Sequence, residues 1–541
     1  MTRKRRRGAQ GASTGRREGD DLGGPTGREE RRVLLIGLLM ALNLFFCLVL
    51  FDPKLHTGGD SSEYVSLASS VLRSGDGYAD SAAPGDPVPH TKYPPGYPLM
   101  LAPLLALFGP NFVILKLLSV ALTVSSVLVF SLWVTERVGP ARWLAVSLAF
   151  AVNPAVVDYS RWILSEAPFL FVTLLALLFL QREAGEKAIG KYFWLSILAI
   201  VAAYYVRSVG IVLIAAGTFY YLLTRQWRKS VYYNAVAAAL SLPWFVRNQL
   251  LEGSATPYIE QFLLRSVYEP EAGYHDPWGM IGRFFTNLWI YSAREMPRVL
   301  VGSDSLWSAH VAVRGLGVVV CVLALAGLVH TARKRVGVAE IYFALSCLAI
   351  LLFEEVVSDV RYLVPLVPLV LVYAADGVTL VTEKGDALGD PSRVTSAAMI
   401  VFAAIGVFSQ LARAPRNIEM IRQYGRGDAL AGYHPNWRSF FLAADWVSAN
   451  TPADAVVTVR KPRLFHLRTG RKVVLYPYST DPDSVLDVVL DTDYVVVDQI
   501  SATTARYLMP GIQAAPERFA VVFESPGTPT WVLRVLEPGE R

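Results

Sequence analysis

Long apolar runs separated by short polar segments dominate the chain from residue 33 to residue 411. The first run, at 33–51, reads VLLIGLLMALNLFFCLVLF and holds nineteen residues without a charge. Crossing about 30 Å of hydrocarbon takes ~20 such residues. No A-x-A-like cleavage site follows it and further runs do, so we interpret it as a signal anchor. Similar runs lie at 111–134, 143–157, 162–181, 192–206, 208–224, 231–246, 315–330, 339–353, 362–380 and 394–411. The pattern predicts eleven membrane-spanning helices.

Two places in this pattern allow another interpretation. Residues 192–224 could form one long helix, but both flanking loops are basic, which favours a hairpin that turns at Arg207. Residues 98–108 are apolar but only eleven in number, which predicts a partial or re-entrant segment.

Lys and Arg residues alternate from one set of loops to the other. The N-terminal arm carries MTRKRRR, and the loops at 135–142, 181–191, 224–230, 331–335 and 383–393 are also basic. The other set is long or acidic and comprises 52–98, 158–161, 247–306 and 354–359. Because basic loops stay on the cytoplasmic side, we expect a multi-pass protein of the cytoplasmic membrane with its N-terminus inside. Eleven crossings would then place the C-terminal domain outside.

From residue 412 the pattern changes to that of a small folded domain. An amphipathic helix, WRSFFLAADWVSAN, is followed by β-like runs at 456–459, 473–476, 494–498 and 519–524, which alternate with helical or loop segments. This predicts an extracytoplasmic α/β domain at 412–541, after a basic, disordered arm at 1–32 and a transmembrane domain at 33–411. No Gly-rich phosphate loop opens its helices, which disfavours a nucleotide site. We expect this domain to recognise an acceptor or to cover the active site.

Composition supports a membrane protein and excludes several other classes. Of 541 residues, 53% are apolar and 18% are charged, and the mean hydropathy is +0.37, which rules out a disordered chain and argues against a soluble one. The net charge of +6 fits the basic loops, and no zinc-type Cys/His pair or RNA-binding signature indicates a nucleic-acid partner. Cys47, Cys321 and Cys347 each lie within an apolar run, so no disulfide framework is predicted.

The first external loop, which contains HTGGDSSEYVSLASSVLRSGDGY, carries two acids three residues apart. Asp60 and Glu63 lie on one face of a predicted amphipathic helix at 61–72, and Asp60 follows two glycines that allow close backbone approach. One interpretation is helix capping, with Asp60 at the N-cap and Glu63 in its first turn. The other is catalysis. Spacing alone leaves both open.

A second group of charged residues lies in NPAVVDYSRWILSEAPF, at 153–169. Asp158, Arg161 and Glu166 would face the outer membrane surface or lie just within it. A carboxylate in the first turn of a membrane helix is costly unless it is paired, so Glu166 is a functional candidate. The alternative is a charge that the helix dipole favours at this end.

Lys92, Arg207 and Arg361 form a third group, at the outer ends of predicted spans. Cations are disfavoured there, so each requires a local reason. Together they could neutralise a lipid phosphate. Singly, each could be a snorkelling side chain or an ion-pair partner.

The order of these segments resembles the integral-membrane GT-C glycosyltransferases. It is most similar to the bacterial branch related to protein O-mannosyltransferases and to the aminoarabinose transferase of lipid A. The matching motifs are GD-x-x-EY-x-x-LA at 59–68, KYPPGYP at 92–98, NP-x4-YSR-x-x-LSE-x-PF at 153–169 and RYLVPLVPLVLVYAADG at 361–377. The resemblance covers about residues 33–380 and implies a polytopic helical fold that carries a C-terminal domain outside the membrane.

The resemblance also implies an activity: inverting transfer of a sugar from a polyprenyl phosphate to a lipid, glycan or protein acceptor outside the membrane. Asp60 falls on the family's catalytic aspartate, the general base. Where relatives have an adjacent Asp-Glu pair, this chain has Asp60-Ser61, and its next acid is Glu63. Glu166 matches the acid of the second external loop, whereas Arg207 is assigned to the phosphate from topology. The remaining assignments are Lys92 and Arg361 at the donor phosphate, and Tyr93, Tyr97, Asp158, Arg161 and Tyr362 in the substrate pocket.

These residues suit the departure of a lipid phosphate. Cations stabilise the charge that builds on the phosphate oxygen, and carboxylates stabilise the oxocarbenium-like sugar and accept the acceptor's proton. A monoester held by Arg and Lys needs a divalent metal less than a diphosphate does. We therefore expect no cofactor and no metal, although Asp60, Asp158 and Glu166 could bind a cation weakly.

Two other classes of protein would share much of this pattern. A lipid or glycan transporter, such as a flippase, is also multi-spanning, but the chain has no visible inverted repeat and its polar residues gather at one membrane face. A non-catalytic assembly protein would use the same acids structurally.

Overall fold

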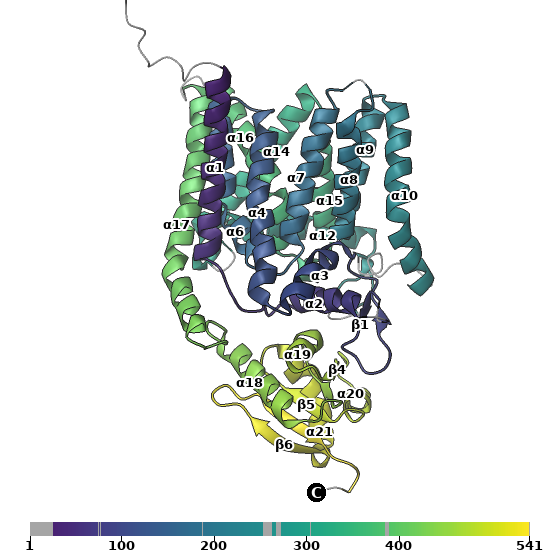
Figure 1. Cartoon of the computed structure of the whole chain (residues 1–541). Helices are drawn as coiled ribbons and strands as arrows, with labels where there is room; N and C mark the ends of the chain where they lie inside the picture. Colours follow the sequence, from purple (N-terminus) through teal and green to yellow (C-terminus); the bar gives the residue numbers. More distant parts are fainter. Residues whose placement is uncertain are drawn as a thin grey trace, which may run out of the picture.

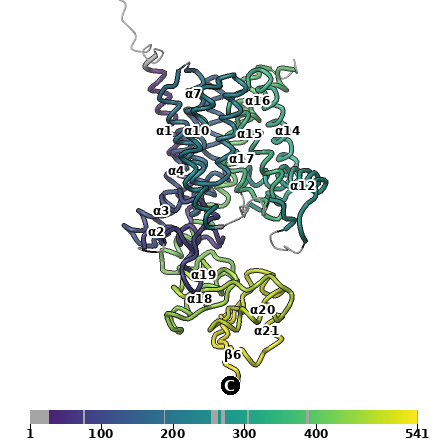
Figure 2. The backbone as a smooth tube through the Cα atoms, turned by 90° about the vertical axis from the view of Figure 1, so that its right-hand side faces the viewer, coloured from purple at the N-terminus to yellow at the C-terminus, as the bar shows by residue number. Residues whose placement is uncertain are grey.

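The protein combines a helical bundle with a small α/β domain at one end of it (Figure 1). The computed structural model describes residues 25–73, 75, 77–186, 188–252, 262–266, 272–302, 305–384 and 389–539. The predicted class, a mostly helical membrane protein with a small sheet, is confirmed. Figure 2 shows the same separation of bundle and domain from the side.

Each apolar run that the sequence marks is largely helical, because an apolar membrane segment satisfies its backbone polar groups best as a helix. The bundle helices are α1 (Pro25–Val49), α4 (Phe112–Thr135), α5 (Pro140–Ala151), α6 (Pro154–Ser160), α7 (Glu166–Glu183), α8 (Lys191–Val206), α9 (Ile211–Leu223), α10 (Trp227–Glu252), α14 (Val311–Lys334), α15 (Val338–Leu352), α16 (Val367–Lys384) and α17 (Pro391–Gly425). Among the described residues, five helices are long and apolar enough to cross a membrane, or six if the bent pair α5–α6 is one span. Eleven crossings stay a prediction.

Helix ends agree with the expected boundaries in one place and differ in two others. The chain breaks at Arg207, between α8 and α9, as the basic flanking loops predict. Helix α1 begins at Pro25, so the last part of the expected disordered arm is helical, while residues 1–24 lie outside the described residues. Helix α17 continues to Gly425, so the expected boundary at 412 falls inside a helix that leads from the bundle towards the domain (Figure 1).

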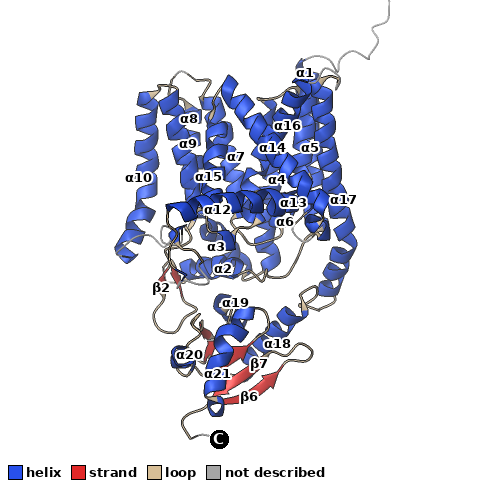
Figure 3. Ribbon diagram, turned by 180° about the vertical axis from the view of Figure 1, so that it is seen from behind, coloured by secondary structure: helices blue, strands red, loops and turns tan. Residues whose placement is uncertain are grey.

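The long loop at 52–98 contains ordered elements at the end of the bundle nearest the domain (Figure 3). These are α2 (Gly59–Leu72), two-residue antiparallel strands β1 (Ala79–Asp80) and β2 (Val88–Pro89), and the start of α3 (Gly96–Phe108). The loop at 247–306 holds α12 (Pro277–Ile290) and α13 (Met296–Val301), joined by a π-helical turn (Tyr291–Glu295). Three 3-10 turns (Glu355–Val357, Val360–Tyr362 and Val364–Leu366) precede α16.

The C-terminal domain is a five-stranded mixed sheet with helices packed on it. Its elements are α18 (Pro435–Asn450), β3 (Val456–Thr458), α19 (Pro462–Thr469), β4 (Lys472–Val474), α20 (Pro482–Val489), β5 (Tyr494–Val497), α21 (Met509–Ala514), β6 (Phe519–Glu524) and β7 (Trp531–Val535). The strand order is β4-β3-β5-β7-β6, with β3 parallel to β4 and β5, and β7 antiparallel to β5 and β6. The sequence pattern missed β7.

The domain docks on the first external loop through its edge strand β4. The backbone N–H of Val473 donates to the carbonyl oxygen of Ala82 at 2.9 Å, and Lys472 Nζ donates to the carbonyl oxygen of Ser81 at 2.9 Å. Tyr433 OH donates to the carbonyl oxygen of Leu55 at 2.5 Å. An edge strand has unpaired backbone groups, and here the loop that carries Asp60 satisfies one of them.

Helices α14 and α16 cross at two glycines. A Cβ atom at Gly327 would clash with the carbonyl oxygen of Tyr373, and one at Gly377 would clash with the carbonyl oxygen of Leu323. Small residues let membrane helices approach this closely. The two helices are therefore in backbone contact at this crossing.

We expect Gly327→Ala to lower the free energy of unfolding by about 1–3 kcal/mol, because the added methyl group overpacks a backbone contact. The matched control is Gly315→Ala on the same helix, where a Cβ meets nothing within 4 Å. That change should be neutral or stabilise by up to about 1 kcal/mol through helix propensity. Thermal unfolding in detergent measures both, and equal midpoints for the two variants would contradict the close crossing.

Candidate functional site

Asp60 lies in the first turn of α2 and makes two side-chain contacts from other parts of the chain. Arg361 Nη1 donates to Asp60 Oδ2 at 2.6 Å, and Tyr93 OH donates to Asp60 Oδ1 at 3.0 Å. The N-cap residue of α2 is Gly58, with no side-chain cap. The capping interpretation of Asp60 is therefore wrong, because its carboxylate faces a cation and a phenol instead of the helix N–H groups.

Arg361 reaches Asp60 from the 3-10 turn before α16, across 301 positions of sequence. Its Nη2 donates to Tyr362 OH at 3.0 Å. The side chains of Asp60 and Arg361 keep 31% and 30% of their surface exposed, so a substrate could reach this pair. Burial would raise the pKa of Asp60, but the Arg361 guanidinium and the Tyr93 hydroxyl outweigh it and hold the pKa below its usual range. Asp60 is therefore ionised at neutral pH.

A second ion pair joins Glu166, at the start of α7, to Arg207, at the break between α8 and α9. Arg207 Nη1 donates to Glu166 Oε1 at 2.5 Å and to Ser165 Oγ at 3.0 Å. Glu166 Oε2 is buried and has no hydrogen-bond partner within the described part of the chain. One of the two carboxylate oxygens is thus left for another donor.

Tyr64, on α2, connects the two ion pairs. Its OH donates to Ser165 Oγ at 2.9 Å, and its ring lies 5.0 Å from that of Tyr93, which holds Asp60. We call Asp60, Tyr93, Glu166, Arg207 and Arg361 the central cluster. Four separate segments of the chain supply it, at one end of the bundle.

Three residues assigned to the substrate pocket, Asp158, Arg161 and Tyr97, are buried within the protein. Asp158 has no exposed surface, and Arg413 of α17 donates to both of its oxygens, at 2.7 and 2.9 Å. Arg161 Nη2 lies 3.5 Å from Asp158 Oδ1 and belongs to the same group. Tyr97 also has no exposed surface, and its OH lies 3.3 Å from Ser119 Oγ. The Asp158–Arg161–Arg413 group and the Tyr97–Ser119 contact each join separate helices. The sequence positions of these residues did not reveal those contacts.

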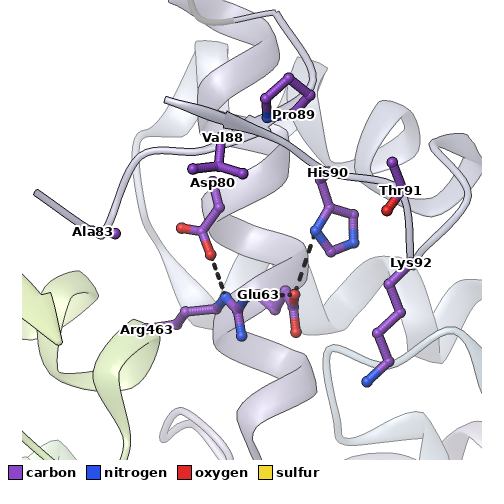
Figure 4. Close-up of a pocket in the computed structure, with 9 residues that line it drawn as sticks. All are labelled: Glu63, Asp80, Ala83, Val88, Pro89, His90, Thr91, Lys92 and Arg463. Carbon is purple, nitrogen blue, oxygen red and sulfur yellow. Dashed lines mark hydrogen bonds and ion pairs between the residues drawn. The ribbon is translucent and has the colours of Figure 1, made fainter. Parts of the chain in front are cut away.

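Glu63 and Lys92 line a pocket between the first external loop and the C-terminal domain (Figure 4). Its volume is about 390 Å³. Its lining, which defines what we call the junction pocket, is Glu63, Asp80, Ala83, Val88, Pro89, His90, Thr91, Lys92 and Arg463. Arg463, at the start of α19, is the residue that the C-terminal domain contributes.

Ion pairs cross this pocket from the domain to the loop. Arg463 Nε donates to Asp80 Oδ2 at 2.6 Å, and Arg463 Nη2 lies 3.3 Å from Glu63 Oε1. Burial raises the pKa of Glu63 to about 7, although Arg463 and Lys92 lower it. Glu63 therefore changes its charge near neutral pH, unlike Asp60.

His90 faces Glu63 as a neutral imidazole. Burial lowers the pKa of His90 to about 4, and its Nε2 accepts a hydrogen bond from the backbone N–H of Tyr93 at 2.8 Å. The proton of the neutral ring is therefore on Nδ1, which lies 3.6 Å from Glu63 Oε1. This contact is polar but is not an ion pair at pH 7.

No group of three or more His, Cys, Asp or Glu side chains suited to a metal ion occurs in the part of the chain that the structure describes. Asp60, Asp158 and Glu166, which could have bound a cation together, each pair with a different arginine. They do not form a shared ligand set.

The sequence missed Arg413, Arg463, Asp80 and His90. Arg413 follows an apolar run and Arg463 lies in the first turn of α19, so neither position is unusual for a solvated cation. His90 and Asp80 lie in the first external loop, where their type was visible but their proximity to Glu63 was not.

The comparisons with known proteins concern the family and the fold of the chain. Residues 92–247 match the model of the dolichyl-phosphate-mannose-protein mannosyltransferase family, a segment that contains Lys92, Glu166 and Arg207. No curated protein matches the chain by sequence.

Two solved structures are similar to the chain over most of its length. ArnT from Cupriavidus metallidurans, bound to undecaprenyl phosphate, has a TM-score of 0.57 and 13% identity over 94% of this chain and 98% of that one. The archaeal oligosaccharyltransferase AglB from Archaeoglobus fulgidus, in complex with an inhibitory peptide and a dolichol-phosphate, has a TM-score of 0.57 and 14% identity over 93% and 74%. The predicted class is confirmed: the fold is that of the GT-C membrane glycosyltransferases, and the family match supports glycosyltransferase activity.

We expect Arg413→Ala to lower the free energy of unfolding by about 3–5 kcal/mol. The change removes the closer partner of the buried Asp158 charge and leaves Arg161 as its remaining cation. The control is Arg393→Ala, since Arg393 is 90% exposed and pairs with Asp390 at 3.6 Å. That change should cost less than about 1 kcal/mol. Thermal unfolding in detergent compares the two, and a fully stable Arg413→Ala variant would show that the buried pair is not structural.

Proposed function

We propose that the protein transfers a sugar from a polyprenyl phosphate to an acceptor hydroxyl, with inversion at the anomeric carbon. The observation that carries this proposal is the Asp60–Arg361 pair, a carboxylate and a guanidinium that are each about one-third exposed. The fold and the family match support glycosyl transfer in general. The carrier lipid is inferred by similarity, because ArnT was solved with undecaprenyl phosphate and AglB with a dolichol-phosphate.

The cations of the site would bind the donor phosphate. Arg361 and Arg207 belong to the central cluster, and Lys92 lies beside Tyr93, with its Nζ 5.3 Å from the ring centre. A guanidinium binds phosphate oxygens as a bidentate donor at least as well as it binds a carboxylate. We propose that Arg361 exchanges Asp60 for a phosphate oxygen when the donor binds, which frees the carboxylate to act as a base.

The transfer step follows from this placement. The acceptor oxygen forms a bond to the anomeric carbon while the bond from that carbon to the phosphate oxygen breaks. The acceptor proton passes to Asp60, and the bonding electron pair leaves on the polyprenyl phosphate, where Arg361, Arg207 and Lys92 stabilise it. Attack on the face opposite the leaving phosphate inverts the configuration. Residues of this chain supply each of these roles, so the scheme requires no metal.

Glu166 would orient the sugar of the donor. Its Oε1 is bound by Arg207, while its buried Oε2 accepts no hydrogen bond within the described part of the chain. A buried carboxylate oxygen without a donor is costly, and a sugar hydroxyl would satisfy it. The same negative charge favours an oxocarbenium-like transition state.

The active site would lie on the outer side of the cytoplasmic membrane. The central cluster and the C-terminal domain share one end of the bundle, and the first described residues of α1 lie at the other (Figure 1). The basic arm and basic loops belong on the cytoplasmic side by the positive-inside rule. We propose that residues 33–411 form the membrane part and that the domain helps to select the acceptor.

The first experiment is a thermal-shift panel of polyprenyl-phosphate sugars with purified protein in nanodiscs. We expect one donor to stabilise the wild type and to lose that effect in Lys92→Ala and Arg361→Ala. Asp60→Asn should still bind this donor but transfer its sugar about 10²–10⁴ times more slowly, because it lacks the general base. The control is Asp445→Asn, since Asp445 pairs with Arg468 on the exposed surface of the domain.

Normal transfer by a well-folded Asp60→Asn variant would refute the assigned base. If no donor stabilises the wild type under conditions in which ArnT responds, the enzyme proposal fails and a transporter becomes the better explanation.

The pH dependence of transfer should separate the two acids of α2. Because the pKa of Glu63 is about 7, its negative charge is lost as pH falls through neutrality, and with it the attraction to Arg463. We therefore expect kcat/KM to decline below about pH 7 in the wild type. The pKa of Asp60 is lowered, so its own loss of activity should appear only in acid, below the usual aspartate range.

Glu63→Gln should remove the decline near pH 7 and keep the one in acid. A decline near pH 7 that persists in Glu63→Gln would assign it to another group.

A further inference from the structure

We infer that the junction pocket binds the acceptor and that this acceptor is a carbohydrate. The inference rests on the proposed glycosyl transfer and names its second substrate. Its basis is the geometry of the pocket, which the first external loop and Arg463 of the C-terminal domain build together (Figure 4).

The lining of the pocket suits a ligand with many hydroxyl groups. Glu63 and Asp80 offer carboxylate oxygens that accept hydrogen bonds, and Arg463 offers donors. Sugar hydroxyls do both at once. Two carboxylates disfavour a phosphate group, and the few small apolar residues (Ala83, Val88 and Pro89) are too little surface for a lipid chain.

The size of the pocket also fits a sugar ring. Its volume of about 390 Å³ lies at the lower end of the range of about 300–1,000 Å³ for small-molecule sites. Partly buried ion pairs fix its walls, since Arg463 lies 2.6 Å from Asp80 and 3.3 Å from Glu63. These pairs hold the polar groups of the pocket in place before a ligand arrives.

The pocket lies next to the proposed base. Glu63 follows Asp60 by three residues on α2, a rise of about 4.5 Å along the helix. His90 lines the pocket and stacks on Tyr93, with ring centres 5.4 Å apart, and Tyr93 donates to Asp60. A sugar in the pocket could therefore present one hydroxyl to Asp60 while Glu63, Asp80 and Arg463 hold the others.

Every bond and proton in the proposed transfer can then be assigned. The acceptor sugar's oxygen bonds to the anomeric carbon of the donor, its proton goes to Asp60, and the polyprenyl phosphate leaves with the electron pair of the broken carbon–oxygen bond. Because Arg463 forms one wall, the pocket is complete only when the C-terminal domain is docked. Recognition of the acceptor would thus depend on both parts of the protein.

The test fills the pocket without changing any of its ion pairs. Ala83 lines the pocket and makes no ion pair or side-chain hydrogen bond, so Ala83→Trp places an indole in the space. The control is Ala514→Trp, at an exposed position at the end of α21. A second variant, Thr91→Val, removes one lining hydroxyl and leaves the ion pairs unchanged.

The assay uses the donor that stabilises the wild type, with octyl hexosides and octyl pentosides as acceptors. We expect at least one glycoside to be a substrate. Its KM should rise at least tenfold in Ala83→Trp and at least threefold in Thr91→Val, but not in Ala514→Trp. Donor-induced thermal stabilisation and slow hydrolysis of the donor by water should be unchanged in Ala514→Trp, and donor-induced stabilisation should remain detectable in Ala83→Trp and Thr91→Val.

The outcomes separate this inference from the proposed function. If the wild type binds and hydrolyses a donor but accepts no glycoside, or prefers Ser/Thr peptides, the carbohydrate assignment is wrong. An unchanged acceptor KM in Ala83→Trp would refute the pocket itself. Absence of both donor binding and donor hydrolysis in the wild type would instead overturn the proposed function.

Discussion

Carboxylates at the end of an apolar bundle need cationic partners, and in this protein arginines from distant segments supply them. Asp60 pairs with Arg361, Glu166 with Arg207 and Asp158 with Arg413. Removing charges from water costs several kcal/mol per ion, and good geometry with further hydrogen bonds offsets that cost. The requirement draws α2, α7, α17 and the turn before α16 to the same end of the bundle. The fold near the site therefore depends on these pairs as well as on apolar packing.

Exposure distinguishes the Asp60–Arg361 pair from the Asp158–Arg413 pair. Asp158 has no exposed surface, and Arg413 donates hydrogen bonds to both of its oxygens. This pair therefore connects α17 to α6. Asp60 and Arg361 are each about one-third exposed. The pairs of Arg463 with Glu63 and Asp80 join the C-terminal domain to the loop that carries Asp60. Ion pairs thus link helices to one another and also link the domain to the bundle.

Much of the site could be predicted because its residue types are unfavourable where they occur. Cations at the predicted outer ends of spans and an acid in the first turn of a membrane helix stand out against an apolar background, which singled out Glu166, Arg207 and Arg361, whereas Asp60 was assigned its role from the family resemblance. The same reasoning also selected Asp158, because a buried structural carboxylate and a catalytic carboxylate look alike in the sequence. It overlooked Arg463, because an arginine in a short helix of a domain outside the apolar runs is ordinary. Type and position do not reveal a partner that lies hundreds of residues away.

Local sequence patterns were enough to predict the helices of the bundle, the basic and acidic loop sets and the presence of a C-terminal α/β domain. Those features follow from local hydrophobic patterns. The thickness of the bilayer sets the length of an apolar run, and the need to hydrogen-bond its backbone makes that run helical. The folded structure was needed to see that Asp60 contacts Arg361 and not the N-terminus of its own helix. It was also needed to see that Arg463 contacts Glu63 in the junction pocket. The physical reason is that these contacts join residues roughly 300 to 400 positions apart. Their proximity depends on how helices cross and where the domain docks, which no local pattern encodes.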